Sequence, residues 1–446
     1  MNNEKLVTFY PGVYTPEEEA AIQRYRNGET PLMFEGLQRV PPMDDWTVRL
    51  FAKCWNPYDP LFSDPAYAKE AGYEDVPAMP GYLSIEVRGT FPKELGTVSR
   101  PDGTSYIGDG YDHEDLYYRP IYPGEKLTMG PIKRDFYDAT PAEGSTKRIL
   151  IMINECDVFD EKGEVVAKCI RRGPEALKKS LYPNVSKREL EGVPGGPPTP
   201  GKKGGKPGTM PGGLGMGYTH PQHIYTDEDY ETMKTYWKNE KIRGSETLYW
   251  EDVNIGDEPI PTCEPPQYGG TIVRNMAFWD LLRFNDGGIR EELLQGGGRS
   301  VRNEQGLYEL PMTSRHLGLG EMASLYNYHG KLLATRCLTN WCGDKGFVTR
   351  FGWRFVNDAE PEKQFNHFPA EYFRPTELLK VPYMKDRFAN SHGMGYDAYI
   401  TRGYVYDKYI GEDGGHYVDL ILWVEDFDGN IEQECPATVR LPSRTA

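Results

Sequence analysis

A stretch rich in glycine and proline is the feature that most limits how this chain of 446 residues can fold. Between Gly192 and Gly217, 17 of 26 residues are Gly or Pro. Such a segment buries little apolar area, so we expect a linker, with a flap over an active site as the alternative. Because a chain of this length exceeds one compact core, the sequence predicts two domains, over 1–175 and 227–446, joined by a linker over 176–226.

Apolar patterning in the N-terminal half predicts an early helix over 17–26 and then antiparallel strands. Apolar residues on both faces indicate a buried strand over 148–158. The residues at 160–163 are typical of a hairpin turn, with the returning strand over 165–169. A strand, a Pro-Gly turn and the start of another strand are expected over 116–127.

The C-terminal half repeats this plan. Segment 227–243 is expected to be a helix, because it is acidic at its start and basic at its end, as the helix dipole favours. The pattern over 322–338 is the strongest helical one in the chain. Further strands are expected over 347–356, 399–409, 417–426 and 437–441.

Charge and cysteine usage exclude several classes of partner. The net charge of −16 disfavours binding to nucleic acid or to an anionic membrane surface. No apolar run approaches the length of a membrane span, and the first residues do not resemble a secretory signal. The seven cysteines are scattered and form no CxxC pair. We therefore expect a cytoplasmic protein without a metal or another cofactor.

Two segments carry a family resemblance. The loop from Asn56 to Ala68 (NPYDPLFSDPAYA) leads to a Pro-Gly step, Ala78 to Tyr82 (AMPGY), that opens an apolar helix. This order resembles the signature of the MaoC-like, hot-dog-fold enoyl-CoA hydratases, in particular the fatty-acid-synthase-type dehydratase domain. The string LTNWCGDKGF over 338–347 looks like the helix end of tandem MaoC dehydratases. Segment 249–258 resembles the strand and turn that open MaoC domains, so a strand followed by a turn is expected there. The resemblance implies an α+β double hot-dog, each half a long helix wrapped by a curved antiparallel sheet, and a homo-oligomer of two or more chains.

The resemblance also implies where a substrate binds. In the family, a backbone N–H at the start of the hot-dog helix binds the thioester carbonyl, and a glycine there permits close approach. Gly81 matches this glycine, and Pro80 and Tyr82 flank it. In the C-terminal half, Gly318 or Gly320 would play the same role.

Candidate acid and base residues follow from the same alignment. The positions that are acidic and His in active members fall on Pro57 and Phe62, and Asp59, at the family's Asn position, is the possible substitute. The alternative is that Asp59 caps a turn. In the C-terminal half, His316 precedes the expected helix and Asp286 is its candidate partner. The alternative for His316 is a hydrogen bond to the helix start.

These matches imply a lyase that reversibly hydrates an enoyl-CoA or dehydrates a 3-hydroxyacyl-CoA. In such a reaction one group takes a proton from water while another supplies a proton to Cα. Tyrosine and tryptophan near both sites indicate a bulky or aromatic acyl group. The alternative is a non-catalytic subunit that binds acyl-CoA or scaffolds a lyase or thiolase complex. Basic residues available for CoA phosphates are Lys202, Lys203, Lys206, Arg171 and Arg172.

Overall fold

The computed structural model describes fifteen stretches of the chain. They are 9–30, 40–41, 43–83, 105–106, 112–138, 142–144, 149–178, 225–265, 301–302, 308–309, 329–355, 377–384, 398–427, 429 and 431–445. The expected linker over 176–226 falls outside these residues except at its two ends, and the division into domains stays a prediction.

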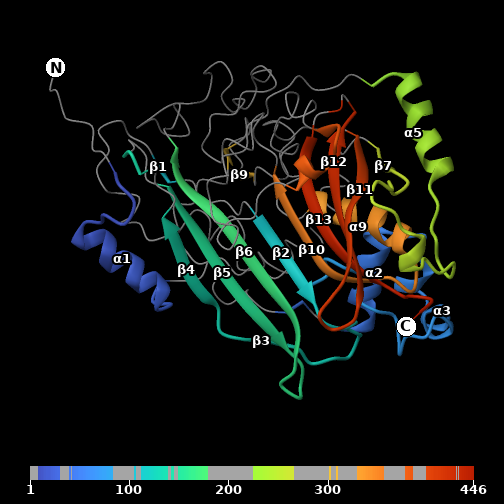
Figure 1. Ribbon diagram of the computed structural model, residues 1–446, viewed down its shortest axis with the longest axis horizontal. Coiled ribbons are helices and arrows are strands. Elements are labelled where there is room, and N and C mark those ends of the chain that lie inside the picture. The colour runs from blue at the N-terminus through green and yellow to red at the C-terminus, as the bar shows by residue number, and fades with distance from the viewer. Residues whose placement is uncertain are drawn as a thin grey trace.

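One antiparallel sheet of eleven strands runs through both halves of the chain (Figure 1). Its N-terminal strands are β1 (Ser105–Tyr106), β2 (Asp112–Tyr117), β3 (Thr128–Met129), β4 (Lys133–Asp138), β5 (Ile149–Phe159) and β6 (Val165–Lys178). Its C-terminal strands are β7 (Thr262–Glu264), β10 (Phe347–Phe355), β11 (Tyr399–Ile410), β12 (His416–Asp426) and β13 (Ile431–Leu441). A separate pair consists of β8 (Val301–Arg302) and β9 (Tyr308–Glu309).

The two halves meet where β2 pairs with β10. The strand order is β3-β5-β6-β2-β10-β13-β12-β11-β7, with β4 on β5 and β1 on β6. Across the junction, Asp115 lies opposite Phe351 and His113 lies opposite Trp353. All four of these side chains are fully buried. The backbone hydrogen bonds of this one pair of strands therefore make a single sheet out of both halves.

Five helices and three short 3₁₀ turns are described around the sheet. The helices are α1 (Pro16–Arg26), α2 (Asp45–Trp55), α3 (Pro65–Glu70), α5 (Asp227–Asn239) and α9 (His329–Cys342). The 3₁₀ turns are η1 (Pro60–Phe62), η2 (Trp250–Asp252) and η4 (Leu378–Lys380). α1 begins where its capping box places it, since Thr15 accepts from the Glu18 N–H and Glu18 accepts from the Thr15 N–H. It lies against β4, at the left of Figure 1.

The α9 helix is the apolar spine of the C-terminal half. It contacts β10, β11, β12 and β13, and its buried Leu333, Cys337 and Leu338 belong to the main hydrophobic core. A helix laid across an antiparallel sheet is the arrangement expected for each half, and the prediction of an α+β fold of this kind is confirmed for the C-terminal half. The apolar helix expected to open at Gly81 would lie beyond residue 83, where the described segment ends.

Most of the predicted elements are confirmed, but one is wrong. Segment 249–258 is a 3₁₀ turn followed by a second turn at 255–256, with no strand among its residues. The indole N–H of Trp250 donates to the Tyr417 carbonyl at 3.0 Å, and the Lys408 ammonium donates to the Trp250 and Val253 carbonyls. Two backbone hydrogen bonds, from the Gly256 N–H to the Val405 carbonyl and from the Val405 N–H to the Asp257 carbonyl, and these side-chain contacts together hold the segment beside the sheet.

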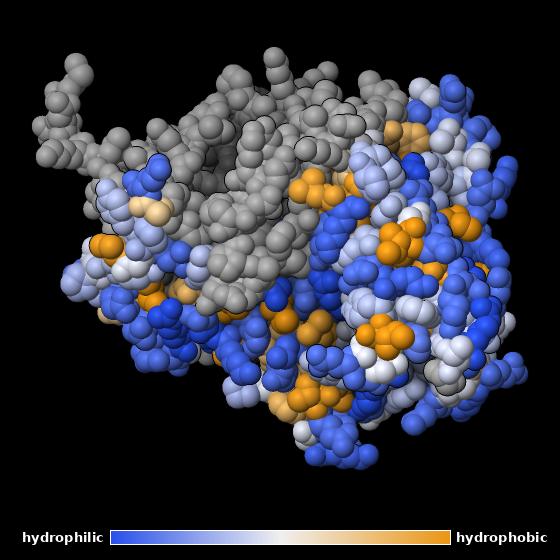
Figure 2. All heavy atoms as spheres, in the orientation of Figure 1, coloured by the Kyte–Doolittle hydropathy of each residue, from blue (hydrophilic) through white to orange (hydrophobic). Residues whose placement is uncertain are grey.

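The hydrophobic residues on the visible described surface are separate spots among hydrophilic ones (Figure 2). Most apolar side chains lie inside, between the sheet and the helices. Within the described residues, no helix is both long and apolar enough to span a membrane.

Gly352 of β10 lies at the junction of the two halves, where there is no space for a larger side chain. A Cβ atom at Gly352 would meet the His113 carbonyl oxygen at 2.9 Å and the Pro436 ring at 3.2 Å. We expect Gly352→Ala to lower the free energy of unfolding by about 1–3 kcal/mol, because β2 and β13 must move apart. Urea unfolding measures the change, with exposed Lys133→Ala in β4 as the control. An unchanged unfolding midpoint would contradict this account of the junction.

Candidate functional site

A small cavity lies where the Pro80–Gly81 turn, the end of β2 and the C-terminal end of α9 meet. Its volume is about 50 Å³, which is room for a few water molecules. Its walls are mainly apolar and aromatic, and they come from both halves of the chain. They include Phe62, Tyr73, Pro80, Tyr82, Tyr117, Thr339, Cys342 and Phe347.

One peptide group at the edge of this cavity is held at both of its ends. The Gly81 N–H donates to the Tyr117 hydroxyl at 2.9 Å, and the Pro80 carbonyl accepts from the Thr335 hydroxyl at 3.3 Å. These two atoms belong to the same peptide plane, so the plane is clamped between β2 and α9. Gly81 has φ of 93°, a backbone conformation that favours glycine. The glycine that the resemblance singles out therefore lies in a fixed orientation beside the cavity.

A buried polar chain supports the Tyr117 hydroxyl. Tyr117 donates to the Asp115 carboxylate at 3.0 Å, and the other Asp115 oxygen lies 3.5 Å from Nε2 of His113. His113 and Asp115 have no exposed surface. Burial, and next the negative charge of Asp115, raise the pKa of Tyr117 well above its ordinary value, so the hydroxyl keeps its proton.

Sequence reasoning missed this chain of residues. Their spacing of two places them on one face of β2, and all three side chains are buried. Three titratable residues on the buried face of a strand are the signal that could have identified them.

Asp59 caps the turn that contains Leu61 and Phe62, two residues of the cavity wall. Its carboxylate accepts from the Leu61 N–H at 3.1 Å, at the start of η1. The side chain is buried, and burial raises the pKa of Asp59 to about 6, with the charge of Asp344 adding to the effect. This hydrogen bond shows that Asp59 caps a turn, which was the alternative interpretation of this residue. Its raised pKa also makes it a carboxyl group that changes charge near neutral pH.

The position that carries His in active members of the family is an apolar wall here. Phe62 is buried and lines the cavity next to Leu61. Tyr82 also lines it, with its ring edge-on to Phe51 at 5.2 Å between centroids. Tyr73, on the same wall, donates its hydroxyl to the Asp344 carbonyl at 2.6 Å. The wall at this position is therefore apolar and aromatic, and its tyrosine hydroxyls are hydrogen-bonded to the protein at Tyr73 and Tyr117.

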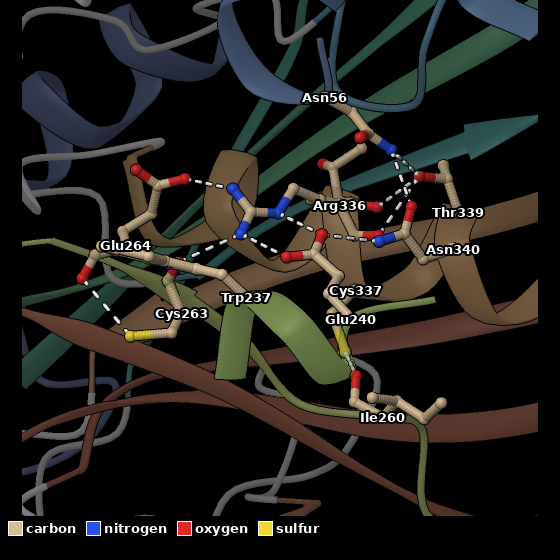
Figure 3. A network of polar contacts seen from close by, with 11 residues as sticks. Asn56, Trp237, Glu240, Ile260, Cys263, Glu264, Arg336, Cys337, Thr339 and Asn340 are labelled. Atoms are coloured by element: carbon tan, nitrogen blue, oxygen red, sulfur yellow. Dashed lines mark hydrogen bonds and ion pairs between the residues drawn. The ribbon is translucent and has the colours of Figure 1, made fainter. Parts of the chain in front are cut away.

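A buried polar network fixes the signature loop on α9 (Figure 3). The Asn56 amide donates to the Thr339 hydroxyl at 3.1 Å and to the Asn340 side chain at 3.0 Å. Asn340 donates in turn to Glu240 at 2.9 Å. Glu240 also forms an ion pair with Arg336 at 2.8 Å. The network links the end of α2 to the end of α5 through one face of α9.

Arg336 is the centre of that network. Its guanidinium contacts the carboxylates of Glu240 and Glu264 and donates to the Cys263 carbonyl at 3.0 Å. Arg336 is almost completely buried. Two carboxylates around one guanidinium raise its pKa although burial opposes the charge.

Several predicted site residues lie outside the described part of the chain. They are Asp286, His316, Gly318 and Gly320. Of the basic residues considered for CoA phosphates, Arg171 is fully buried, so the expectation that it lies at a cleft mouth is wrong. In the segments described here, no group of three or more His, Cys, Asp or Glu could hold a metal ion.

Comparison with known proteins finds a family that the N-terminal part of the chain matches. Residues 42–169 match the family described as "FAS1-like, dehydratase domain region". The resemblance to dehydratases of this type is confirmed, and the matched region contains Asp59, Pro80, Gly81, Asp115 and Tyr117. No curated protein matches the sequence.

Similar solved structures include three whose alignments span most of both chains. One is a MaoC-like dehydratase with 14% identity and a TM-score of 0.42, covering 91% of this chain and 96% of that chain. A putative MaoC domain dehydratase from Chloroflexus aurantiacus has 11% identity and a TM-score of 0.40, over 90% and 92% of the two chains. A conserved hypothetical protein from Mycobacterium tuberculosis, described as a double hot-dog, has 10% identity and a TM-score of 0.41, over 93% and 98%.

Removal of the central guanidinium tests the network. We expect Arg336→Met to destabilise the protein by about 3–5 kcal/mol, because Glu240 and Glu264 are left buried without their cation. Chemical denaturation measures the loss. The matched control is Lys241→Met, whose partner Glu246 is exposed, and it should cost less than about 1 kcal/mol. Equal effects of the two substitutions would contradict the structural role of Arg336.

The raised pKa of Asp59 predicts a pH dependence of stability. Between pH 3.8 and about 6, the folded protein holds a proton at Asp59 that the unfolded chain has released. Stability therefore falls as the pH rises through this interval. We expect Asp59→Asn, which removes this cost, to gain up to about 3 kcal/mol over the wild type between pH 4 and 7.

Urea titrations of both proteins across this pH range measure the difference. Asp64→Asn, at the exposed N-cap of α3, controls for the same substitution at another cap. A difference between Asp59→Asn and wild type that stays constant with pH would refute the assignment.

Proposed function

We propose that the protein is a lyase acting on acyl-CoA thioesters, because residues 42–169 match the FAS1-like dehydratase family. The reaction is reversible hydration of an enoyl-CoA, equivalent in reverse to dehydration of a 3-hydroxyacyl-CoA. In the hydration direction, water adds to Cβ, a proton is delivered to Cα, and the thioester carbonyl takes on negative charge between the two steps. A fixed hydrogen-bond donor at that oxygen lowers the barrier, because it stabilises charge that develops during the reaction.

The clamped Pro80–Gly81 peptide is the observation that carries the proposal. Its N–H lies beside a mainly apolar cavity and cannot turn away, because Thr335 holds the other side of the same peptide plane. A donor fixed in this way does not have to reorganise when a carbonyl arrives. The aromatic wall that includes Tyr82 and Phe62 supports an acyl chain as the group that enters.

The acid and base groups are part of the proposal. Asp59 is the candidate in the N-terminal half, because its raised pKa allows it to exchange a proton near neutral pH. Asp286 and His316 are the candidates in the C-terminal half. We further propose that the protein works in the cytoplasm as a homo-oligomer.

A specific observation also favours a second candidate, a non-catalytic protein that binds acyl-CoA or scaffolds a lyase or thiolase complex. The usual catalytic positions of the N-terminal loop hold Pro57 and Phe62, and Asp59 is occupied as a turn cap. Such a protein would keep the carbonyl-binding peptide and the apolar wall but would have no group to activate water.

Turnover of enoyl thioesters separates the two functions. We expect the purified protein to consume crotonyl-CoA or an aromatic enoyl-CoA, seen as loss of the absorbance of the conjugated thioester. Loss of 100-fold or more, roughly the value of a general acid or base, is expected in Asp59→Asn if the N-terminal site is active. The same loss in His316→Ala and Asp286→Ala would assign the C-terminal site. Binding of acyl-CoA without turnover would select the non-catalytic function.

A further inference from the structure

We propose that the Tyr117 hydroxyl occupies the place of a ligand's carbonyl oxygen at the Gly81 N–H, and that Asp115 acts through Tyr117 to set how tightly an acyl thioester binds. This inference rests on the proposed function, because it takes the Gly81 N–H as the donor to the thioester carbonyl. It adds an internal competitor for that donor.

The position of the tyrosine oxygen is the first argument. It lies 2.9 Å from the Gly81 nitrogen, the distance at which a bound carbonyl oxygen would accept the same hydrogen bond. Tyr117 lines the cavity, and so do Pro80 and Tyr82 on either side of Gly81, so this hydrogen bond joins two parts of the cavity wall. A ligand carbonyl must therefore displace the tyrosine oxygen from this N–H or share the N–H with it.

The second argument is the strength of the Tyr117 oxygen as a hydrogen-bond acceptor. The Tyr117 proton is directed to the Asp115 carboxylate at 3.0 Å. A hydroxyl that donates to a carboxylate becomes a stronger acceptor, because successive hydrogen bonds polarise one another. The Tyr117 oxygen, polarised by Asp115, thus resembles the negatively charged oxygen that forms on a thioester during hydration. Both oxygens would accept from the Gly81 N–H.

The surroundings of Asp115 keep this polarisation strong. Asp115 lies between Phe351 on β10 and Cys169 on β6, and all three side chains are fully buried. Nε2 of His113 lies 3.5 Å from the carboxylate on the same strand. Water does not screen the carboxylate in such a place, so its attraction for the Tyr117 proton is larger than at a surface.

The clamp on the peptide is the third argument. If the Pro80–Gly81 peptide could rotate, it could present its N–H to a ligand away from Tyr117. The hydrogen bond from Thr335 to the Pro80 carbonyl opposes that rotation. A carbonyl that binds the Gly81 N–H must then compete with the Tyr117 oxygen at one fixed position. This competition lowers the free energy that the ligand gains from its hydrogen bond.

Binding of a saturated thioester tests the proposal without turnover. We expect Tyr117→Phe to bind butyryl-CoA about 3- to 10-fold more tightly than the wild type by isothermal titration calorimetry, because the competing acceptor is gone. Asp115→Asn keeps the hydroxyl but weakens its polarisation, so a smaller gain in the same direction is expected. It also tests the proposal if Tyr117→Phe does not fold.

Two controls isolate the carbonyl. S-Butyl-CoA is a thioether that lacks only the carbonyl oxygen, and its affinity should be the same in Tyr117→Phe and in the wild type. Tyr25→Phe removes another buried tyrosine hydroxyl, one that donates to Asn154 at 2.6 Å outside the cavity, and it should bind butyryl-CoA as the wild type does.

The outcomes distinguish this inference from the proposed function. Equal or weaker butyryl-CoA binding by Tyr117→Phe would overturn it and would indicate that the hydroxyl donates to the ligand or has only a structural role. Equal tightening for butyryl-CoA and S-butyl-CoA would also overturn it, since the added space would then be the cause. Absence of butyryl-CoA binding in every variant would overturn it together with the thioester site. Absence of enoyl-CoA turnover by the wild type concerns only the proposed reaction.

Discussion

The pairing of β2 with β10 is the interaction on which the rest of the structure depends. It joins six N-terminal strands to five C-terminal ones in a single sheet. It also brings Tyr117, at the end of β2, beside the turn that α9 holds from the other side. Without this pairing, Tyr117 and Thr335 would not meet at the Pro80–Gly81 peptide, whose plane they fix. The cavity therefore belongs to neither half alone.

Polar contacts, in addition to the apolar core, define the geometry of this place. Apolar burial supplies most of the stability of such a fold, but it is not directional. The directional contacts are the hydrogen bonds of Asn56 to α9, the buried Arg336 with its two carboxylates, and the chain from Gly81 through Tyr117 to Asp115. Each joins segments far apart in the sequence, and together they hold the signature loop and the Pro-Gly turn to the sheet and to α9.

Local patterns in the sequence were sufficient for most of the fold. The apolar periodicity of β5 and β6 with their turn, the capped helix α1 and the closing strands β11 and β12 all lie close to where their residues predict them. The 249–258 segment differed because Trp250 and Lys408 bind distant backbone groups, which no local pattern reveals. For a similar reason, the helix from residue 227 ends at Asn239, where Glu240 leaves the helix to meet Arg336.

The site was predicted less completely than the fold. The Pro80–Gly81 step was found because a family resemblance marks it, and the same resemblance directed attention to Asp59. His113, Asp115 and Tyr117 were overlooked because they belong to a strand outside the signature loop. Their proximity to Gly81 arises only from the register of β2. Pairwise contacts of this kind depend on tertiary packing, which a single sequence does not encode locally.

The central claim is that the Pro80–Gly81 peptide, held between α9 and β2, binds the carbonyl of an acyl thioester. A crystal structure of the protein with butyryl-CoA tests it most directly. The account predicts the carbonyl oxygen within about 3 Å of the Gly81 nitrogen, with the Tyr117 oxygen displaced or sharing the N–H. A thioester bound elsewhere, with the hydrogen bond between Gly81 and Tyr117 unchanged, would contradict it.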